Sequence, residues 1–243
     1  MIALFQYPTT ENVRIIFPMR LYFLTSPSHR VLRDEWFLPT LRDDFDLVEA
    51  EAPQDCQTGE YMTDGWAQAM IRKCDLVLKA IRENEEKVFL YSDVDVQFFD
   101  RTEQSIRSIV AGHDLLIQRN DPSGKPCPGF FACVGNERTK KLWTDVRGAI
   151  ASGTFPCDQT ALHHLVRQGA DSIRWSLLPD VFFCGGLLTG RRWSPGTPLA
   201  VPDGMVLHHA NWTVGMEGKL AQLAHVRAIV GRTRALSVSL AAC

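Results

Sequence analysis

Two aspartates, Asp93 and Asp95, stand one residue apart directly after a short apolar run at residues 88–91 (Val-Phe-Leu-Tyr). A run of this length and composition predicts a strand buried on both faces of a parallel sheet. Ligands of open α/β sheets bind beyond the carboxyl ends of the strands, which is where these carboxylates are expected. Two carboxylates this close favour a positive charge between them, such as a divalent cation that carries a phosphate. The alternative is a strand-ending turn, where aspartate is common.

Composition narrows the class of protein around this motif. The chain has 243 residues, 45% of them hydrophobic, enough for one large domain. Its 26 basic and 28 acidic residues give a net charge of −2, which indicates neither a nucleic-acid surface nor an anionic membrane surface. Seven cysteines without a Cys-x-x-Cys pair indicate neither a zinc knuckle nor a disulfide framework and favour a reducing compartment.

No targeting or membrane segment is expected from the sequence. No apolar run is long enough to span a bilayer. The first eighteen residues do not follow the pattern of a secretory signal, because they contain Pro8, Glu11, Arg14 and Pro18. We therefore expect a cytoplasmic protein.

Predicted strands and helices alternate along the chain. Strands are predicted at residues 21–24, 45–48, 88–91, 114–117, 129–134 and 173–177, and helices at 29–41, 64–81, 102–110, 136–150, 158–169 and from 216. The helix predicted at residues 64–81, which precedes the motif strand in the sequence, has a clear apolar stripe made by Trp66, Met70, Cys74, Val77 and Ile81. Residues 49–62, 119–128 and 182–204 are predicted as loops. The alternation predicts an α/β class, with one Rossmann-like, mostly parallel sheet flanked by helices over residues 19–243. Residues 1–18 are expected to be an extension or an extra strand.

Several polar residues carry two interpretations each. Thr25 and Ser26 follow the first predicted strand, where a base or ribose can rest, or they cap the next helix. Arg72 and Lys73 lie off the apolar stripe, as solvated charges or as contacts to a nucleotide. Asp158 is suited to the N-cap of its helix, which alone would explain it.

Taken in order, these segments resemble the nucleotide-diphospho-sugar transferases of the GT-A glycosyltransferase fold, including retaining galactosyl-, xylosyl- and arabinosyltransferases. The resemblance covers about residues 19–219 and includes a small acceptor-side subregion of that fold. It rests on the helix with Lys73, the Tyr-Ser-Asp-Val-Asp-Val run, Gly129-Phe130-Phe131, the helix start at Asn136, Asp158-Gln159, Leu178-Pro179…Gly185 and His209-Ala210-Asn211-Trp212…Gly215…Lys219. Seven segments in register are more specific than any one of them.

The resemblance implies roles for individual residues. Metal binding is implied for Asp93, Asp95 and His209, with His208 as the adjacent rival, and an imidazole ligand favours Mn²⁺ over Mg²⁺. Binding of the nucleotide sugar is implied for Thr25, Ser26, Lys73, Asp93, Gly129, Gly215 and Lys219. The catalytic pair is Asp158, which contacts sugar hydroxyls, and Gln159, which lies near the anomeric carbon.

The implied activity is transfer of a hexosyl or pentosyl group, with retention, from a nucleotide-diphosphate sugar to a hydroxyl acceptor. A UDP-sugar is the expected donor, and a glycan or glycoconjugate is the expected acceptor. The acceptor region is expected within residues 187–204, where Arg191, Arg192 and Trp193 lie. Trp193 either stacks on a sugar or fills the core.

One segment departs from the family pattern. Many members have Asn-Ala-Gly or Asn-Ser-Gly before Phe-Phe, with the Asn touching the sugar, whereas this chain has Cys127-Pro128-Gly129. A thiol hydrogen-bonds poorly, so the contact is lost or is supplied by Asn120 or Asp121.

Two alternative functions remain open: a non-catalytic descendant that binds a sugar nucleotide or glycan, and an Asp-x-Asp (DxD) metal-dependent phosphohydrolase.

Overall fold

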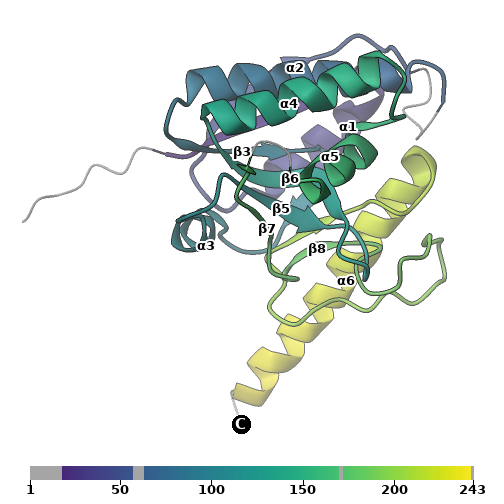
Figure 1. Cartoon of the computed structure of the whole chain (residues 1–243). Coiled ribbons are helices and arrows are strands. Elements are labelled where there is room, and N and C mark those ends of the chain that lie inside the picture. The colour runs from purple at the N-terminus through teal and green to yellow at the C-terminus, as the bar shows by residue number, and fades with distance from the viewer. Residues whose placement is uncertain (1–17, 57–62, 170–171, 242–243) are drawn as a thin grey trace, which may run out of the picture.

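The structure, a computed structural model, describes residues 18–56, 63–169 and 172–241, with side chains up to residue 233. The predicted extension at residues 1–18 lies outside this range except for its last residue. Within it, the chain forms a mixed α/β fold, as the sequence predicts (Figure 1).

A six-stranded sheet forms the centre of the fold, in the order β2-β1-β3-β6-β5-β7. Its strands are β1 (Arg20–Thr25), β2 (Asp46–Glu51), β3 (Val88–Ser92), β5 (Leu115–Arg119), β6 (Pro126–Val134) and β7 (Trp175–Leu177). Strand β6 is antiparallel to both of its neighbours, and the other five run in one direction. The prediction of a mostly parallel sheet is confirmed.

A second sheet has three strands in the order β4-β9-β8. These are β4 (Val96–Phe98), β8 (Phe182–Cys184) and β9 (Leu207–His209). Strand β9 pairs antiparallel with β4 and parallel with β8. This small sheet brings residues from three distant parts of the sequence beside the end of β3.

Helices and the small sheet cover the two faces of the central sheet (Figure 1). One face packs against α2 (Trp66–Glu83), α4 (Glu137–Ala151) and α5 (Asp158–Arg167) around buried residues such as Tyr91, Phe131 and Trp143. The other face packs against the helical segment after β1, α3 (Glu103–Ile109), the small sheet and α6 (Gly215–Ala241). The two apolar cores fix the sheet between them, since both faces of its inner strands β1, β3, β5 and β6 are almost entirely buried.

The segment at residues 29–41 differs from the predicted single helix. It forms short 3₁₀ turns at Pro27–His29 and Leu38–Thr40, one α-turn at Arg30–Leu32 and a π-turn at Arg33–Phe37. Pro39 lacks an amide hydrogen and cannot continue an α-helix. The Thr40 hydroxyl donates instead to the carbonyl oxygens of Trp36 and Phe37, at 2.6 and 3.0 Å.

Other differences concern short strands and helix starts. Strands β4 and β8 were not predicted, because three residues are too few to show a period. Strands β2 and β6 extend into segments predicted as loops, at residues 49–51 and 126–128. Helix α2 begins after Gly65 without a side-chain cap from Thr63 or Asp64, whereas Asn136 caps α4 as predicted, accepting from the Thr139 amide at 3.0 Å.

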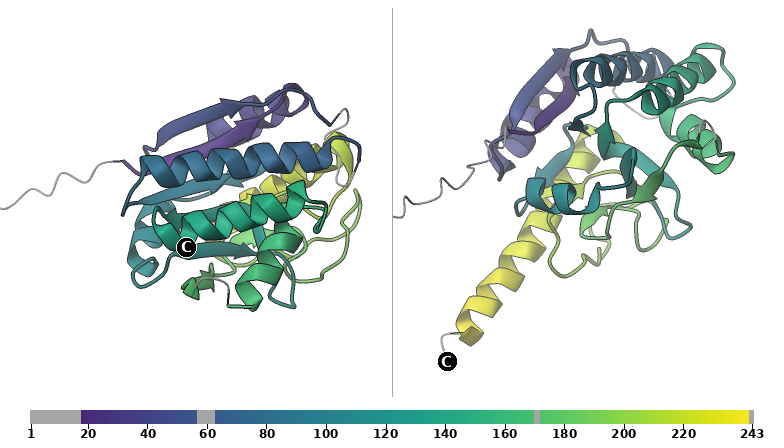
Figure 2. Two further views of the ribbon diagram at one scale, coloured as in Figure 1. Left: turned by 45° about the horizontal axis from the view of Figure 1, so that its top comes forward. Right: turned by 60° about the vertical axis from the view of Figure 1, so that its left-hand side comes forward.

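The C-terminal helix α6 starts beside the small sheet and projects away from the body of the molecule (Figure 2). None of the helices in the described part of the chain combines the length and the apolar character needed to cross a membrane. None of the six cysteines that the structure describes takes part in a disulfide.

Candidate metal and nucleotide-sugar site

The two motif aspartates lie at the end of β3 and are held there by backbone hydrogen bonds. The amide of Asp93 donates to the Gly129 carbonyl oxygen at 2.7 Å, and the carbonyl oxygen of Asp95 accepts from the Ala210 amide at 2.9 Å. The Asp95 side chain is buried, and that of Asp93 is about one-third exposed. The motif therefore joins the central sheet to the small sheet.

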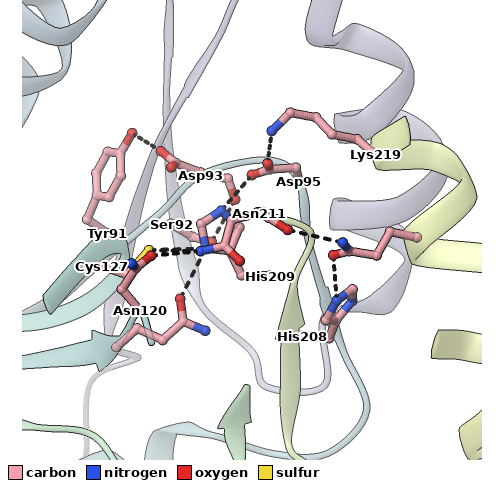
Figure 3. A network of polar contacts seen from close by, with 12 residues as sticks. Tyr91, Ser92, Asp93, Asp95, Asn120, Cys127, His208, His209, Asn211 and Lys219 are labelled. Atoms are coloured by element: carbon pink, nitrogen blue, oxygen red, sulfur yellow. Dashed lines mark hydrogen bonds and ion pairs between the residues drawn. The ribbon is translucent and has the colours of Figure 1, made fainter. Parts of the chain in front are cut away.

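A third ligand candidate, His209, lies against these carboxylates. Strand pairing sets Val96 opposite His209, so the ring lies next to Asp95. His209 Nε2 is 3.3 Å from Asp95 Oδ1, and single ligand atoms of Asp93, Asp95 and His209 all lie within 4.8 Å of one another. Figure 3 shows the three side chains converging, the two aspartates from the connection between β3 and β4 and His209 from β9.

Two lysines balance the carboxylates. Lys219, in the first turns of α6, contacts Asp95 Oδ2 (Figure 3). Lys73 of α2 lies 3.1 Å from Asp93 Oδ1 and 3.0 Å from Asp158 Oδ2, and its side chain is 4% exposed. The Tyr91 hydroxyl adds a 2.9 Å hydrogen bond to Asp93 Oδ1. Of the two interpretations of Lys73, a solvated surface charge is wrong, because the ammonium is buried between two carboxylates.

Charge compensation governs the pKa values in this cluster. Burial alone would lower the pKa of Lys73, but Asp158 and Asp93 outweigh it and raise the pKa well above its usual range. Burial would raise the pKa of Asp95, but Lys219 and His209 outweigh it and hold the pKa well below its usual range. Burial would lower the pKa of His209, but Asp95 raises it to about 10. Without a bound cation, an imidazolium and two ammonium groups face the carboxylates.

The adjacent His208 faces a different set of partners. Its Nδ1 accepts from Gln97 Nε2 at 3.1 Å, and its Nε2 donates to Gln222 Oε1 at 3.1 Å. Burial, and next the charge of His209, lower the pKa of His208 to about 3. The ring is therefore a neutral, fully hydrogen-bonded core side chain, and His209 is the histidine that faces the carboxylates.

The structure explains why two positions of the predicted binding set, 129 and 215, are occupied by glycine. A Cβ atom at Gly129 would lie 2.0 Å from His209 Cε1, so only glycine lets the ring approach β6. Gly215 begins α6 with a φ of +70°, a conformation that glycine adopts without strain. It sets the start of the helix that carries Lys219.

Asp158 and Gln159 lie at the start of α5, and Lys73 connects Asp158 to the cluster through Asp93. The prediction that Asp158 is the N-cap is wrong: Cys157 occupies that position, and Asp158 is the first helical residue. Asp158 Oδ1 accepts from the Gln159 amide at 2.8 Å, while Oδ2 pairs with Lys73. Gln159 Nε2 donates to the Pro126 carbonyl oxygen at 3.2 Å, which places its side chain beside the Cys127 segment.

The Cys127 thiol lies in a polar network rather than in an apolar pocket. Asn211 Nδ2 donates to Cys127 Sγ at 3.5 Å and to Asn120 Oδ1 at 3.3 Å. Trp212 Nε1 donates to the same Asn120 oxygen at 3.0 Å. The suggestion that Asn120 or Asp121 replaces the missing sugar contact stays a prediction, and both residues are buried next to this network.

A pocket opens in front of the cluster, between the ends of β1 and β3 and the start of α2. Five residues of the predicted set line it: Ser26, Lys73, Asp93, Asp95 and Lys219. Sequence reasoning missed other lining residues, among them His29, Gln54, Trp66, Met70 and Tyr91. Trp66 and Met70 belong to the apolar stripe of α2 and line the pocket at the start of that helix, and Met70 also packs against the core.

Two other predicted residues lie away from the pocket lining. The Thr25 hydroxyl is buried and has no hydrogen-bonding partner among the residues that the structure describes. Arg72 pairs with Asp55, a residue of the pocket wall, so it supports the wall rather than reaching the cluster.

The predicted acceptor segment contains one core residue and two surface residues. Trp193 is 5% exposed, packs in the apolar cluster between residues 183–205 and α6, and donates from Nε1 to the Thr197 carbonyl oxygen at 2.8 Å. The core interpretation of Trp193 therefore agrees with the structure. Arg191 and Arg192 are exposed.

Comparison with known proteins identifies the family. The sequence pattern of the nucleotide-diphospho-sugar transferases matches residues 39–223, more than half of the chain. The chain belongs to this family, and the resemblance inferred from its motifs is confirmed. No match was found among curated proteins.

Solved structures agree on the fold. The apo form of the glycosyltransferase GlyE from Streptococcus pneumoniae TIGR4 is 12% identical, with a TM-score of 0.50 over 91% of this chain and 64% of GlyE. A second GlyE structure matches with a TM-score of 0.46, over 68% of this chain and 46% of GlyE, at 12% identity. A glycosyltransferase involved in glycosylating the major capsid of PBCV-1 has a TM-score of 0.44 at 12% identity, over 67% of this chain and 83% of its own. The chain thus spans about half to two thirds of GlyE, and the GT-A-like fold is confirmed.

The buried Lys73 generates a stability prediction. In Lys73→Met, the Asp158 carboxylate, 5% exposed, loses its cation, and we expect unfolding to become easier by about 3–5 kcal/mol. The double variant Lys73→Met/Asp158→Asn should be more stable than the single variant, because the uncompensated charge is removed. Urea unfolding at pH 7 measures both. A double variant no more stable than Lys73→Met would contradict the assigned charge balance.

Proposed function

We propose that this chain is a metal-dependent glycosyltransferase that moves a sugar, with retention, from a nucleotide-diphosphate donor, expected to be a UDP-sugar, to a hydroxyl of a glycan or glycoconjugate. The observation that carries the proposal is the convergence of Asp93, Asp95 and His209 on one another, where both aspartates and the neighbouring Lys219 line the pocket. Family membership supports transfer from a nucleotide sugar.

The donor set fits a divalent cation. Carboxylate oxygens suit Mg²⁺ and Mn²⁺, and the imidazole favours Mn²⁺. Burial of Asp95 and His209 lets a cation there act at short range, with little solvent screening. When bound, such a cation stabilises the negative charge that develops on a departing diphosphate. Asp93, Asp95 and His209 Nε2 are the groups that would hold it.

The residues around the cation position would hold the diphosphate. When no nucleotide sugar is bound, Lys219 contacts Asp95. When the nucleotide sugar binds, the ammonium group of Lys219 would turn to a phosphate oxygen. Ser26 and His29 line the same pocket on the β1 side, where a base or ribose would rest. Charge-assisted hydrogen bonds from Lys219 would favour the departed diphosphate over the intact donor, which is how binding energy accelerates a reaction.

The sugar would lie on the α5 side of the cluster, against Asp158 and Gln159. The Asp158 carboxylate, held by Lys73, can accept hydrogen bonds from sugar hydroxyls. Gln159 carries an amide, which cannot act as the general base that an inverting reaction requires. A retaining reaction, in which the acceptor attacks from the leaving-group face, therefore agrees with this residue. Residues 187–204 are our candidate for acceptor contacts.

Nucleotide binding tests the proposal. Ligands that bind only the native state raise the Tm, so one of UDP, GDP, CDP and ADP should raise it with Mn²⁺ and raise it far less without metal. We expect UDP to be that nucleotide. Asp95→Asn should abolish the metal-dependent shift, because it removes a charged ligand while keeping the side-chain size.

Asp100→Ala is the matched control, since Asp100 is an exposed aspartate just beyond β4. It should keep the full shift. If no nucleotide raises the Tm with any metal, the catalytic proposal fails. If UDP binds with metal but no sugar nucleotide is turned over, even by hydrolysis, the non-catalytic alternative is indicated. Cys127, at the position where many family members have Asn, favours that alternative.

Removal of the Lys219 charge should change the affinities for Mn²⁺ and for UDP in opposite directions. In Lys219→Met, Asp95 loses a competing cation, so Mn²⁺ should bind more tightly, by a few-fold, when no nucleotide is present. UDP should bind the Mn²⁺-loaded variant about tenfold or more weakly, because a charge-assisted hydrogen bond to phosphate is lost. Calorimetric titration measures both affinities. If the affinities for Mn²⁺ and for UDP both rise or both fall, Lys219 does not leave Asp95 to bind a phosphate.

A further inference from the structure

The Gln118 side chain is fully buried at the end of β5 and has a fixed orientation. Its Nε2 donates to the carbonyl oxygens of Phe182 and Phe183, at 3.1 and 3.0 Å. An amide nitrogen has two hydrogens, and both are used here. Turning the amide over would set its oxygen against two carbonyl oxygens with no donor between them, which is unfavourable in a buried site.

This orientation turns Gln118 Oε1 toward His209. The oxygen lies 3.2 Å from His209 Nδ1. An amide oxygen can only accept, so Nδ1 must carry the hydrogen of that bond. The other ring nitrogen, Nε2, is the one that faces Asp95. A glutamine that is itself held by two carbonyl groups thus decides which nitrogen of His209 is presented to the carboxylate cluster.

Two further contacts agree with this assignment. Cys127 Sγ lies 3.6 Å from the same Nδ1 and accepts from Asn211 Nδ2, so the sulfur can also accept weakly from a hydrogen on Nδ1. The ring also lies against Gly129, where a side chain would collide with it. An irregularity in the β5–β6 pairing between Ile117 and Gln118 falls at this position, and such bulges re-aim a side chain.

We propose that Gln118 is a positioning residue of the cation site: it holds His209 with the Nδ1 hydrogen on the amide oxygen and Nε2 directed to the cation. This inference rests on the metal-dependent function proposed above. It assigns a role to a residue that touches neither the cation position nor the pocket. Partners behind a ligand histidine contribute about 10- to 100-fold to metal affinity in comparable sites.

Gln97 offers a matched control. It is also a fully buried glutamine whose Nε2 donates to a histidine and to a backbone carbonyl, here His208 Nδ1 at 3.1 Å and the Leu223 carbonyl oxygen at 2.9 Å. Gln97→Met removes an equivalent buried network but leaves the contacts of His209 in place. Gln118→Met removes the oxygen that accepts from His209.

The experiment compares the full chain with these two variants by following the electron paramagnetic resonance signal of free Mn²⁺ during titration. We expect Gln118→Met to raise the Kd for Mn²⁺ by about 10- to 100-fold, and Gln97→Met to change it by less than about threefold. Nitrogen-15 NMR of the histidine rings in the Mg²⁺-saturated wild type should show Nδ1 of His209 protonated and Nε2 without a hydrogen. This second measurement stands even if Gln118→Met does not fold.

Four results would overturn the proposal. Equal Mn²⁺ affinity in Gln118→Met and the wild type would remove the positioning role, and equal losses in both variants would reduce it to general packing. A His209 ring that is protonated on Nε2 in the Mg²⁺-saturated protein would contradict the assignment directly. A wild type that binds no Mn²⁺ would overturn the metal-dependent function together with this inference, whereas the first two results leave that function intact.

Discussion

The site depends on how three buried or half-buried carboxylates are kept charged at one edge of the sheet. Asp93, Asp95 and Asp158 share a small set of positively charged partners. An unpaired charge buried in the protein costs several kcal/mol of stability. Lys73 lies between Asp93 and Asp158, while Lys219 and His209 balance Asp95. In the proposed function, a cation held by Asp95 and His209 and a diphosphate held by Lys219 replace the direct contacts among these three residues. The Lys73 side stays as a fixed support.

The small sheet explains how distant residues meet. Pairing of β4 with β9 sets His209 beside Asp95, and pairing of β9 with β8 brings the carbonyl groups of Phe182 and Phe183 behind Gln118. Helix α6 follows directly and brings Lys219 to the same place. The backbone pairing of these short strands therefore fixes the positions of His209 and Gln118 in the site.

Much of this fold could be predicted because the central strands and helices have strong periodic patterns. Residues 88–91 and the stripe of α2 predicted β3 and most of the buried face of α2, whereas β4 and β8 are too short to show a period. In the site, Asp93, Asp95 and Lys219 were predicted from motifs, and the structure brings them together. The burial of Lys73, the choice between His208 and His209, and the contact of Gln118 with His209 could not be predicted, because they depend on packing between elements far apart in sequence.

The central claim is that Asp93, Asp95 and His209 hold a divalent cation when a nucleoside diphosphate is bound. Anomalous diffraction at the manganese edge, from crystals grown with Mn²⁺ and UDP, tests it most directly. We expect a single strong peak bounded by the two carboxylates and His209 Nε2, with the diphosphate in contact with it and with Lys219. Bound UDP with no manganese peak at these residues, or with the peak elsewhere, would contradict it.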